Sequence, residues 1–352
     1  MSEGYLTKSL KNSAWQPPAG WRCLETIEAH TAGEPFRVIL SGWPPVAGRN
    51  ILEKRRFLQA HHDHLRRALI WEPRGHTDMY GCLLTEPDSP ESDLGVIFLH
   101  NEGYSTMCGH GIIALTKVVL ELGLIQKEGR EVSMRIDTPA GQIISRAVRE
   151  NNRVSRVSFQ NVPSFVVALD ETIDVPGLGV CHYDLAFGGA FYAFLRAEEL
   201  GLQLIPAEFR KIVDLGCRLK QAIAVRQPVR HPYVEDLSFL YGVIIVGPPH
   251  NPGHHSRNVC IFAEGEVDRS PTGTGVSARA ALHFARGELA VGEEFTVESL
   301  IGTCFTGRVV AETQFGPYPA VIPEVSGEAF LVGKSQFFLD PDDPLQHGFF
   351  LR

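Results

Sequence analysis

The sequence predicts a mixed α/β protein built from two similar domains that face each other across a cleft. Three observations support this fold class. The chain has 352 residues, which suffices for two ordinary domains of roughly 150 residues each. Many short strand-like runs alternate with fewer helical segments. A strand–loop–helix unit also occurs twice, at an offset that takes residue 108 to residue 272.

The individual elements follow from local composition. Runs of β-branched residues bounded by glycine or proline predict strands, and the clearest of these runs are at 153–162, 241–247, 294–302 and 318–327. Apolar residues at helical spacing predict the helices, which we expect over 52–69, 112–122, 207–224 and 276–286.

The two copies of the repeated unit align without a gap. Residues 108–111, with the sequence CGHG, coincide with residues 272–275, with the sequence TGTG. Downstream of the helix, Gly123 coincides with Gly287, and each glycine stands where a helix end favours positive φ. Agreement at strand, loop, helix and terminating glycine favours duplication over chance.

A weaker echo of the repeat places HTAGEP, at 30–35, opposite AFGGAF, at 186–191. A duplicated α/β unit predicts that each domain contributes one glycine-bracketed loop and one helix N-terminus to a shared cleft. The free N–H groups and the positive dipole ends of two such helices would aim at one point. The sequence therefore predicts a site for a small anion between the domains.

Cys108 stands at the start of the first repeated helix, and this position favours a reactive role. A helix N-terminus and its N–H groups acidify a thiol, and His110 would add to the effect. The neighbouring glycines let a ligand approach the backbone closely. Buried free cysteines are common packing residues, and we assign that role to Cys82, Cys181, Cys217, Cys260 and Cys304.

A thiolate in a carboxylate-binding cleft has two chemical uses. It can be a nucleophile, or it can be a general base that removes the proton α to the carboxylate. For the second use, N–H groups at the two loops would stabilise the charge that builds on the carboxylate oxygens; these are the N–H groups of Gly109, His110, Gly273 and Thr274. The twofold layout favours the base, because a pair of groups flanking one carbon suits proton removal and return.

Composition excludes other classes of function and predicts the compartment. The net charge is −8 without a basic patch, which argues against nucleic acid as a partner. Seven scattered cysteines without a Cys-x-x-Cys motif argue against a disulfide scaffold and for a reducing compartment. Residues 1–20 have no apolar core and predict a loose arm rather than a secretory signal. No apolar run reaches transmembrane length, so we expect a cytoplasmic protein with no membrane partner.

The motifs MCGHGI, DRSPTGTG, HTAGEP, EPRGHTDMYG and FGGAF resemble the proline racemase family. The resemblance extends from about residue 25 over nearly the whole chain. It implies a two-domain fold like that of diaminopimelate epimerase, no cofactor, no metal and a homodimer. In the racemases and epimerases of this family two cysteines face each other across the substrate Cα. Cys108 matches the first cysteine, and Thr272 replaces the second, as in the subgroup of trans-3-hydroxy-L-proline dehydratases.

The same resemblance implies further site residues and a division of the chain. Substrate-binding residues would be Gly109, His110, Gly273 and Thr274, with His110 and Asp268 near the ring nitrogen of an imino acid. We expect residues 1–20 to form the arm, 21–162 plus 323–352 a first domain that carries Cys108, and 163–322 a second domain that carries Thr272.

Threonine at position 272 changes the expected reaction. Its hydroxyl is too weak an acid to act as the second base, so two-base racemisation should fail. In trans-3-hydroxy-L-proline the 3-hydroxyl lies on the same ring face as the α-hydrogen. If Cys108 takes that hydrogen, the resulting thiol is placed to return the proton to the departing hydroxyl, giving Δ1-pyrroline-2-carboxylate and water. The alternatives are a proline or 4-hydroxyproline racemase or epimerase and a non-catalytic carboxylate-binding protein.

Several other polar residues attract attention without entering the predicted catalytic set. The histidines within 61–64 and 250–255 suggest metal binding, but a solvated helix surface and an exposed loop are the favoured interpretations. For four residues we leave a cleft-lining role and a structural role open: Arg74, His76, Asp78 and Glu34.

Overall fold

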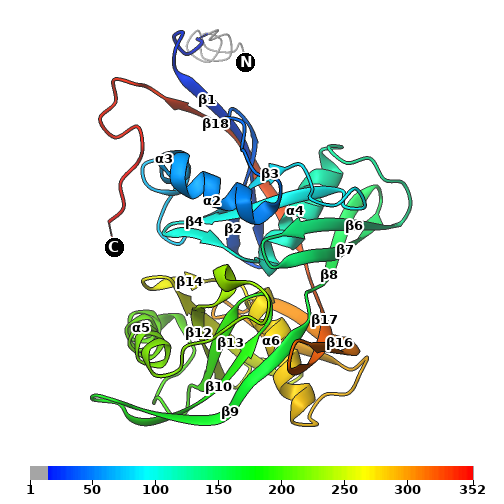
Figure 1. The fold of residues 1–352 in the computed structure, drawn as a ribbon, viewed down its shortest axis with the longest axis vertical. Helices are drawn as coiled ribbons and strands as arrows, with labels where there is room; N and C mark the ends of the chain where they lie inside the picture. The colour runs from blue at the N-terminus through cyan, green and yellow to red at the C-terminus, as the bar shows by residue number, and fades with distance from the viewer. Residues whose placement is uncertain (1–14, 352) are drawn as a thin grey trace, which may run out of the picture.

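The computed structural model describes residues 15–351 and has two lobes, one above the other in Figure 1. Most of the expected loose arm at residues 1–20 lies outside the described range. The upper lobe contains β1 (Arg22–Thr31), β2 (Glu34–Ser41), α2 (Ile51–His61), α3 (Asp63–Ile70), β3 (Tyr80–Thr85), β4 (Leu94–His100), β5 (Gly103–Ser105), α4 (Gly109–Glu121), β6 (Glu131–Thr138), β7 (Gly141–Glu150), β8 (Arg153–Gln160) and β18 (Ala329–Leu339).

The lower lobe holds the middle of the chain. It contains β9 (Ser164–Val175), β10 (Gly179–Phe187), β11 (Phe191–Arg196), η1 (Pro206–Glu208), α5 (Phe209–Arg226), η2 (Glu235–Leu237), β12 (Leu240–Gly247), β13 (Ser256–Phe262), β14 (Glu266–Asp268), α6 (Gly273–Ala285), β15 (Glu294–Glu298), β16 (Cys304–Phe315) and β17 (Tyr318–Gly327).

Strand pairing repeats from one lobe to the other. The parallel pair β2–β3 corresponds to β11–β12, and the antiparallel pair β3–β4 corresponds to β12–β13. The parallel pair β4–β6 likewise corresponds to β13–β15. Strand β18 flanks β1 as β9 flanks β10, and β8 pairs with β17. The repeat predicted from the sequence is therefore confirmed as a repeat of topology.

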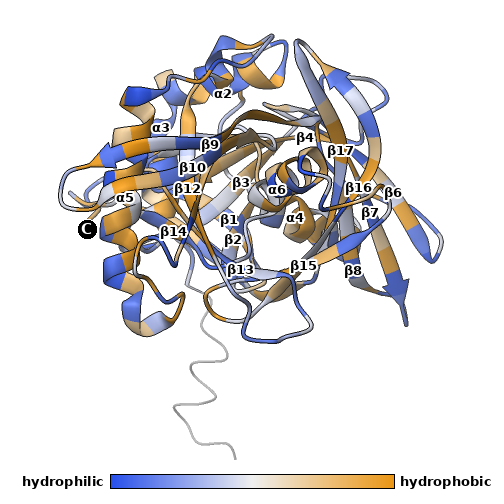
Figure 2. Cartoon of the chain, turned by 90° about the horizontal axis from the view of Figure 1, so that it is seen from below, coloured by the Kyte–Doolittle hydropathy of each residue, from blue (hydrophilic) through white to orange (hydrophobic). Residues whose placement is uncertain are grey.

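Each lobe wraps its sheet around one central helix. Helices α4 and α6 both have 13 residues, and they begin at Gly109 and Gly273. In the view from below, the two helices lie at the centre with strands around them (Figure 2). All of α4 from Gly109 to Leu120 is buried, as are the first ten residues of α6, so apolar burial on every side fixes both helices in place.

The two central helices begin earlier than the sequence predicts. We expected 112–122 and 276–286, whereas each helix starts three residues sooner, within its glycine pair. Glycine lowers helix propensity, which is why the sequence pattern placed these residues in loops. Tertiary contact between the two helix tips overrides that preference.

The prediction of one helix over 52–69 is wrong in one respect, because two helices, α2 and α3, occupy this segment. At His62 the backbone leaves the helical region, with φ −129° and ψ 13°. Asp63 then opens α3, and its carboxylate accepts a hydrogen bond from Arg66 Nε at 2.6 Å. An acidic side chain in a first turn stabilises the new helix start, and periodicity alone could not reveal this restart.

Among residues 15–351 there is no helix with both the length and the apolar character needed to cross a membrane.

Candidate active site

The N-termini of α4 and α6 meet between the two lobes. A Cβ built on Gly109 would lie 2.6 Å from Gly273 Cα, and one built on Gly273 would lie 2.8 Å from Gly109 Cα. Both distances are far inside van der Waals contact, so only glycine permits this approach. The approach brings two positive helix ends together.

A closed pocket lies at this junction, and it contains every residue of the predicted site. Its volume is about 20 Å³, which is room for about one water molecule. A larger molecule therefore fits only if the lining residues move. The lining residues are Glu34, Tyr80, Met107, Cys108, Gly109, His110, Tyr192, Tyr241, Cys260, Phe262, Asp268, Thr272, Gly273 and Thr274.

Cys108 is the N-cap residue of α4. Its backbone is extended, with φ −143° and ψ 105°, and its Sγ accepts a hydrogen bond from Gly111 N–H at 3.3 Å. The same sulfur lies 3.3 Å from His110 Nδ1. The side chain is 4 % exposed, so helix and histidine hold the sulfur in one orientation inside the cleft.

The expectation that Cys108 has a low pKa is wrong for the buried position that the sulfur occupies. Burial raises the pKa of the Cys108 thiol well above its usual value, and the Gly111 N–H opposes this effect only in part. The nearby charge of Asp268 raises the pKa further. Desolvation and negative charge thus outweigh the helix N-terminus, and the resting sulfur is a protonated thiol.

His110 is neutral in this environment. Burial, followed by the charge of Arg269, lowers the pKa of His110 to about 3. Its ring packs edge-on against Phe36 and Tyr80, at centroid distances of 5.6 and 5.0 Å. A neutral ring beside Cys108 can accept the S–H proton or donate to a thiolate, depending on its tautomer.

Asp268 is held at the end of β14 on the other lobe. Its Oδ1 accepts a hydrogen bond from Ser270 N–H at 2.8 Å, and its Oδ2 lies 4.0 Å from His110 Nδ1. Burial raises the pKa of Asp268 to about 6, although hydrogen bonds from Ser270 oppose the rise. At neutral pH the carboxyl is mostly ionised and offers a buried negative charge.

Thr272 occupies the position in α6 that Cys108 occupies in α4, but with another backbone conformation. Its φ is 64° and its ψ is 90°, a strained region for a β-branched residue. Its side chain makes no capping bond. The Thr272 hydroxyl lies close enough to Asp268 to oppose the rise in the pKa of that carboxyl. Its buried Oγ1 nevertheless forms no hydrogen bond of good geometry with any described residue.

The backbone N–H groups at the two helix tips are available to a ligand. Helices leave their first N–H groups without an intrahelical partner, and the described residues supply no acceptor for Gly109, His110, Gly273 or Thr274. A carboxylate placed between the tips would accept several of these bonds and offset both dipoles. The arrangement can therefore bind a small carboxylate and stabilise charge that develops on it.

Sequence reasoning missed three tyrosines that line the pocket. Tyr80 and Tyr241 join their hydroxyls across the cleft at 3.0 Å, and Tyr192 OH lies 2.7 Å from Thr274 Oγ1. They come from β3, β12 and β11, and no local pattern distinguishes them from core aromatic residues. Glu34, whose role the sequence left open, also lines the pocket.

Arg269 ties the two lobes together at the pocket edge. Its backbone N–H donates to Glu34 Oε2 at 2.7 Å, and its guanidinium donates to the carbonyls of Asp78 and Thr77 at 2.6 and 3.2 Å. These bonds connect the residue after β14 in the lower lobe with the start of β2 and the loop before β3 in the upper lobe.

Of the residues left open from the sequence, three do not line the pocket. Arg74 bonds the carbonyl of Gln346, and His76 Nδ1 lies 2.8 Å from the carbonyl of Thr77. Asp78 is buried beside Arg269 at 3.8 Å. Within residues 15–351 no three His, Cys, Asp or Glu side chains are grouped as a metal site.

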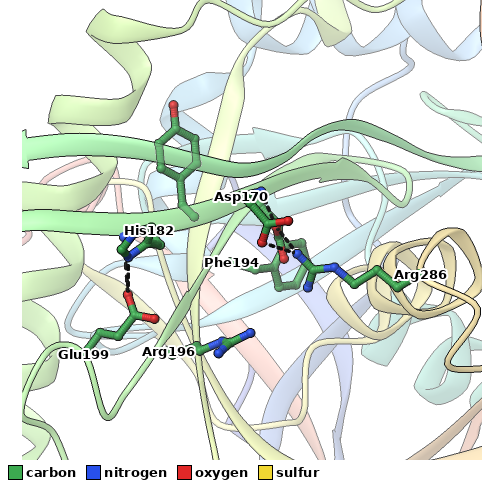
Figure 3. A pocket seen from close by; sticks show the side chains of 8 residues that line it. Asp170, His182, Phe194, Arg196, Glu199 and Arg286 are labelled. Atoms are coloured by element: carbon green, nitrogen blue, oxygen red, sulfur yellow. Dashed lines mark hydrogen bonds and ion pairs between the residues drawn. The ribbon is translucent and has the colours of Figure 1, made fainter.

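A larger pocket of about 240 Å³ lies elsewhere on the lower lobe (Figure 3). Arg286 pairs there with Asp170 and Asp184 at 2.7 and 2.8 Å, and His182 pairs with Glu199 at 3.1 Å. The two carboxylates offset the charge of Arg286, and the lining contains no cysteine. The pocket at the helix tips is the candidate active site, because a thiol, free N–H groups and buried carboxyls meet there and not in the larger pocket.

Comparison with known proteins agrees with this geometry. The family model described as proline racemase matches residues 26–350. The chain is 46 % identical to the trans-3-hydroxy-L-proline dehydratase of Colwellia psychrerythraea, covering 100 % of both chains. It is 44 % identical to the human protein of the same name, covering 95 % of this chain and 96 % of that one.

Among solved structures, the chain is similar to a hydroxyproline epimerase from Agrobacterium vitis with bound trans-4-hydroxy-L-proline. The TM-score is 0.88 at 32 % identity, and the match covers 94 % of this chain and 96 % of that one. The predicted two-domain α/β fold is confirmed by this likeness.

Proposed function

The chain belongs to the proline racemase family, and from that premise we propose that it is a cofactor-independent hydro-lyase that converts trans-3-hydroxy-L-proline to Δ1-pyrroline-2-carboxylate and water. One observation carries the proposal: the two matched helix tips present one sulfur, at Cys108, and one alcohol, at Thr272. Relatives of this chain that bear the dehydratase name support it.

The substrate carboxylate lies between the helix tips in this proposal. It accepts hydrogen bonds from the N–H groups of Gly109, His110, Gly273 and Thr274. Asp268, with a buried charge at neutral pH, faces the ring nitrogen of the imino acid. These contacts fix the Cα of the ring beside Cys108.

Cys108 then removes the α-proton as a thiolate. Negative charge moves toward the carboxylate, where two helix dipoles and four N–H groups stabilise it. The C3–O bond breaks, the hydroxyl leaves as water, and the resulting cyclic enamine tautomerises to the imine. Thr272 takes no proton, because an alcohol is not basic or acidic enough near neutral pH, so the far face of Cα stays inactive.

The role of Cys108 as a thiolate base has to be compatible with the raised pKa of its thiol, and the charge of the substrate makes it so. Part of the rise in the pKa of Cys108 comes from the negative charge of Asp268. A bound imino acid carries a protonated ring nitrogen, which offsets that charge and favours the thiolate. A thiolate of high pKa is also a stronger base for a weakly acidic C–H bond.

The alternative within the family is a proline or 4-hydroxyproline racemase or epimerase, as the name of the Agrobacterium vitis neighbour indicates for that protein. Thr272 argues against it, because inversion requires a titrating group on each face. The test is to incubate the purified protein with trans-3-hydroxy-L-proline and look for the pyrroline product. Absence of product together with clean epimerisation of 4-hydroxyproline would overturn the proposal.

A non-catalytic carboxylate-binding protein is the alternative outside the enzymes. Thiol alkylation separates it from the hydro-lyase. An active-site Cys108 should react with a small alkylating agent once the cleft opens, and pyrrole-2-carboxylate, a planar mimic of the deprotonated substrate, should protect it. Alkylation at the same rate with and without that ligand would favour the non-catalytic role.

We also propose that the protein works as a cytoplasmic homodimer. Free thiols at all seven cysteine positions support a reducing compartment, and the homodimer follows from the family resemblance. Light scattering on the purified protein tests the dimer. The proposed domain borders are supported by β17, which pairs with β9 through residues 320–321 and with β8 through residues 324–327.

A further inference from the structure

Resting on the function proposed above, we propose that Glu34 is the general acid that protonates the departing 3-hydroxyl. Cys108 and Glu34 then divide the reaction: the sulfur takes the α-proton, and the carboxyl supplies the proton that completes the water molecule.

Glu34 is fixed in the cleft by a tight hairpin turn. It is the first residue of β2 and pairs with Thr31 across the antiparallel ladder. Between them, Ala32 and Gly33 both have positive φ, 52° and 92°, as a two-residue hairpin loop requires. The carboxyl therefore has a defined position in the lobe that carries Cys108.

The two carboxyl oxygens of Glu34 have unequal surroundings. Oε2 accepts the backbone N–H of Arg269 at 2.7 Å. Oε1 is buried and has no hydrogen-bond partner among the described residues. An unsatisfied buried polar atom is costly, and Glu34 lines the same pocket as Cys108, so a polar group of the substrate is the partner that this oxygen lacks.

The electrostatic setting favours the protonated form of this carboxyl. Burial raises the pKa of Glu34 well above its usual value, the charge of Asp268 adds to the rise, and Arg269 opposes it. Asp268 is mostly ionised at neutral pH, whereas Glu34 favours its protonated form. Neighbouring carboxyls with such different protonation suit different tasks. Asp268 carries the charge that faces the ring nitrogen, and neutral Glu34 has an O–H to donate.

A carboxylic acid is also a better proton donor for this step than the Cys108 thiol. Burial raises the pKa of both groups, but a thiol starts from a much higher value. The step balances: the C–H pair of electrons forms the C2–C3 double bond, and the C3–O pair leaves with the hydroxyl. The hydroxyl takes the Glu34 proton, and solvent later takes the Cys108 proton and returns one to Glu34.

Glu34→Gln tests the assignment, since the amide keeps an acceptor oxygen for Arg269 N–H and loses the acidic proton. The matched control is Glu266→Gln. Glu266 is an equally buried glutamate near the cleft, it bonds His100 Nδ1 at 3.0 Å, and its Oε2 is also unsatisfied, but it does not line the pocket. Each variant is assayed with trans-3-hydroxy-L-proline, with the corresponding 3-chloro compound, and for binding of pyrrole-2-carboxylate.

We expect Glu34→Gln to lose about 10²- to 10⁴-fold in water elimination. Chloride needs no proton to leave, so its release should stay within about threefold of the unmodified protein, as should the affinity for pyrrole-2-carboxylate. Glu266→Gln should change the rates of water and chloride elimination by the same factor.

Three results would overturn the assignment: unchanged water elimination in Glu34→Gln, equal loss of water and chloride elimination, or rate and affinity falling together. The last two would make Glu34 a residue that positions Cys108 or holds the cleft closed. If the unmodified protein forms no pyrroline product, the proposed function fails, whatever the variants do.

Discussion

The tips of α4 and α6 share a backbone plan and differ in one side chain and its conformation. Both helices have 13 residues and start at a glycine that touches its counterpart. Cys108 precedes α4 in extended conformation and caps it through Sγ. Thr272 precedes α6 at φ 64°, and its Oγ1 makes no capping bond.

The contrast between Cys108 and Thr272 separates the features that the two helix tips share from the one in which they differ. In the proposed function, carboxylate binding uses both helix tips, which agrees with the symmetric glycines and free N–H groups. Proton transfer in the proposed elimination needs a base on one face only, and the second tip carries Thr272 in place of a sulfur. Variants that remove, restore or perturb one side of the pair therefore test the mechanism directly.

Removal of the sulfur should have the largest effect. Cys108→Ser should lower pyrroline formation by about 10³-fold, because a serine hydroxyl is far too weak an acid to supply a base. Product formation from trans-3-hydroxy-L-proline is the measurement. Cys304→Ser, at a partly exposed cysteine on β16 outside the pocket, is the control. Near-normal turnover of Cys108→Ser would remove the sulfur from the mechanism.

Disturbance of the contact between Gly109 and Gly273 should have the second largest effect on activity. Gly109→Ala and Gly273→Ala each place a methyl group within 2.8 Å of the opposite backbone, and relief of such an overlap costs roughly 1–3 kcal/mol. Both variants should therefore lose about 10- to 100-fold in kcat/KM.

Titration with pyrrole-2-carboxylate should show the same loss of affinity on either side. Gly333→Ala, where the nearest atom to a new Cβ would be 4.0 Å away, should bind normally. A large effect at one glycine and none at the other would contradict carboxylate binding by both helix tips.

Introduction of a second sulfur at residue 272 should change the stereochemistry at Cα more than the rate of dehydration. In Thr272→Cys the far face gains a titrating group, so L-proline should undergo α-hydrogen exchange with inversion, which chiral chromatography in deuterium oxide detects. Dehydration should fall by about tenfold at most. Because residue 272 has a backbone conformation unlike that of residue 108, inversion should be slow. Exchange with retention only would show that the new sulfur does not reach Cα.

The pH dependence of Asp268 should give the smallest change in activity, although its effect on stability is larger. Its pKa is raised from 3.8 to about 6, so the ionised form is destabilised by folding. This carboxyl favours folding fully below about pH 4, and that contribution is lost as the pH rises through about 6. The difference corresponds to about 3 kcal/mol.

Asp268→Asn should therefore make the ligand-free protein more resistant to urea at pH 8, with little change at pH 4. KM for the hydroxyproline should rise severalfold in the unmodified protein as the pH falls below 6, because protonated Asp268 no longer faces the ring nitrogen with a charge. A flat KM between pH 5 and 8 would place the nitrogen elsewhere.

Local sequence was sufficient to identify the repeat and its unequal pair. Helix, glycine and cysteine signals lie within a few residues of one another, so the lobes, the helix tips and the substitution at Thr272 were readable without a structure. The seven predicted site residues line one pocket. Six of them precede or begin the two central helices, whereas Asp268, at the end of β14, was expected only from the family resemblance. The length of the helix over 52–69 was misjudged, because its break at His62 is a backbone event with no periodic signature.

Only the tertiary structure decided the environment of those residues. Glu34 and the tyrosines reach the pocket from strands far apart in the chain, and no spacing rule joins them. The pKa of Cys108 depends on how deeply the closed lobes bury it and on which carboxyls they bring beside it. A helix N-terminus is formed by neighbouring residues of the chain, so it can be predicted from sequence. Desolvation and the charges of distant residues act through space, so only the packed structure determines how strongly they oppose the helix N-terminus at Cys108.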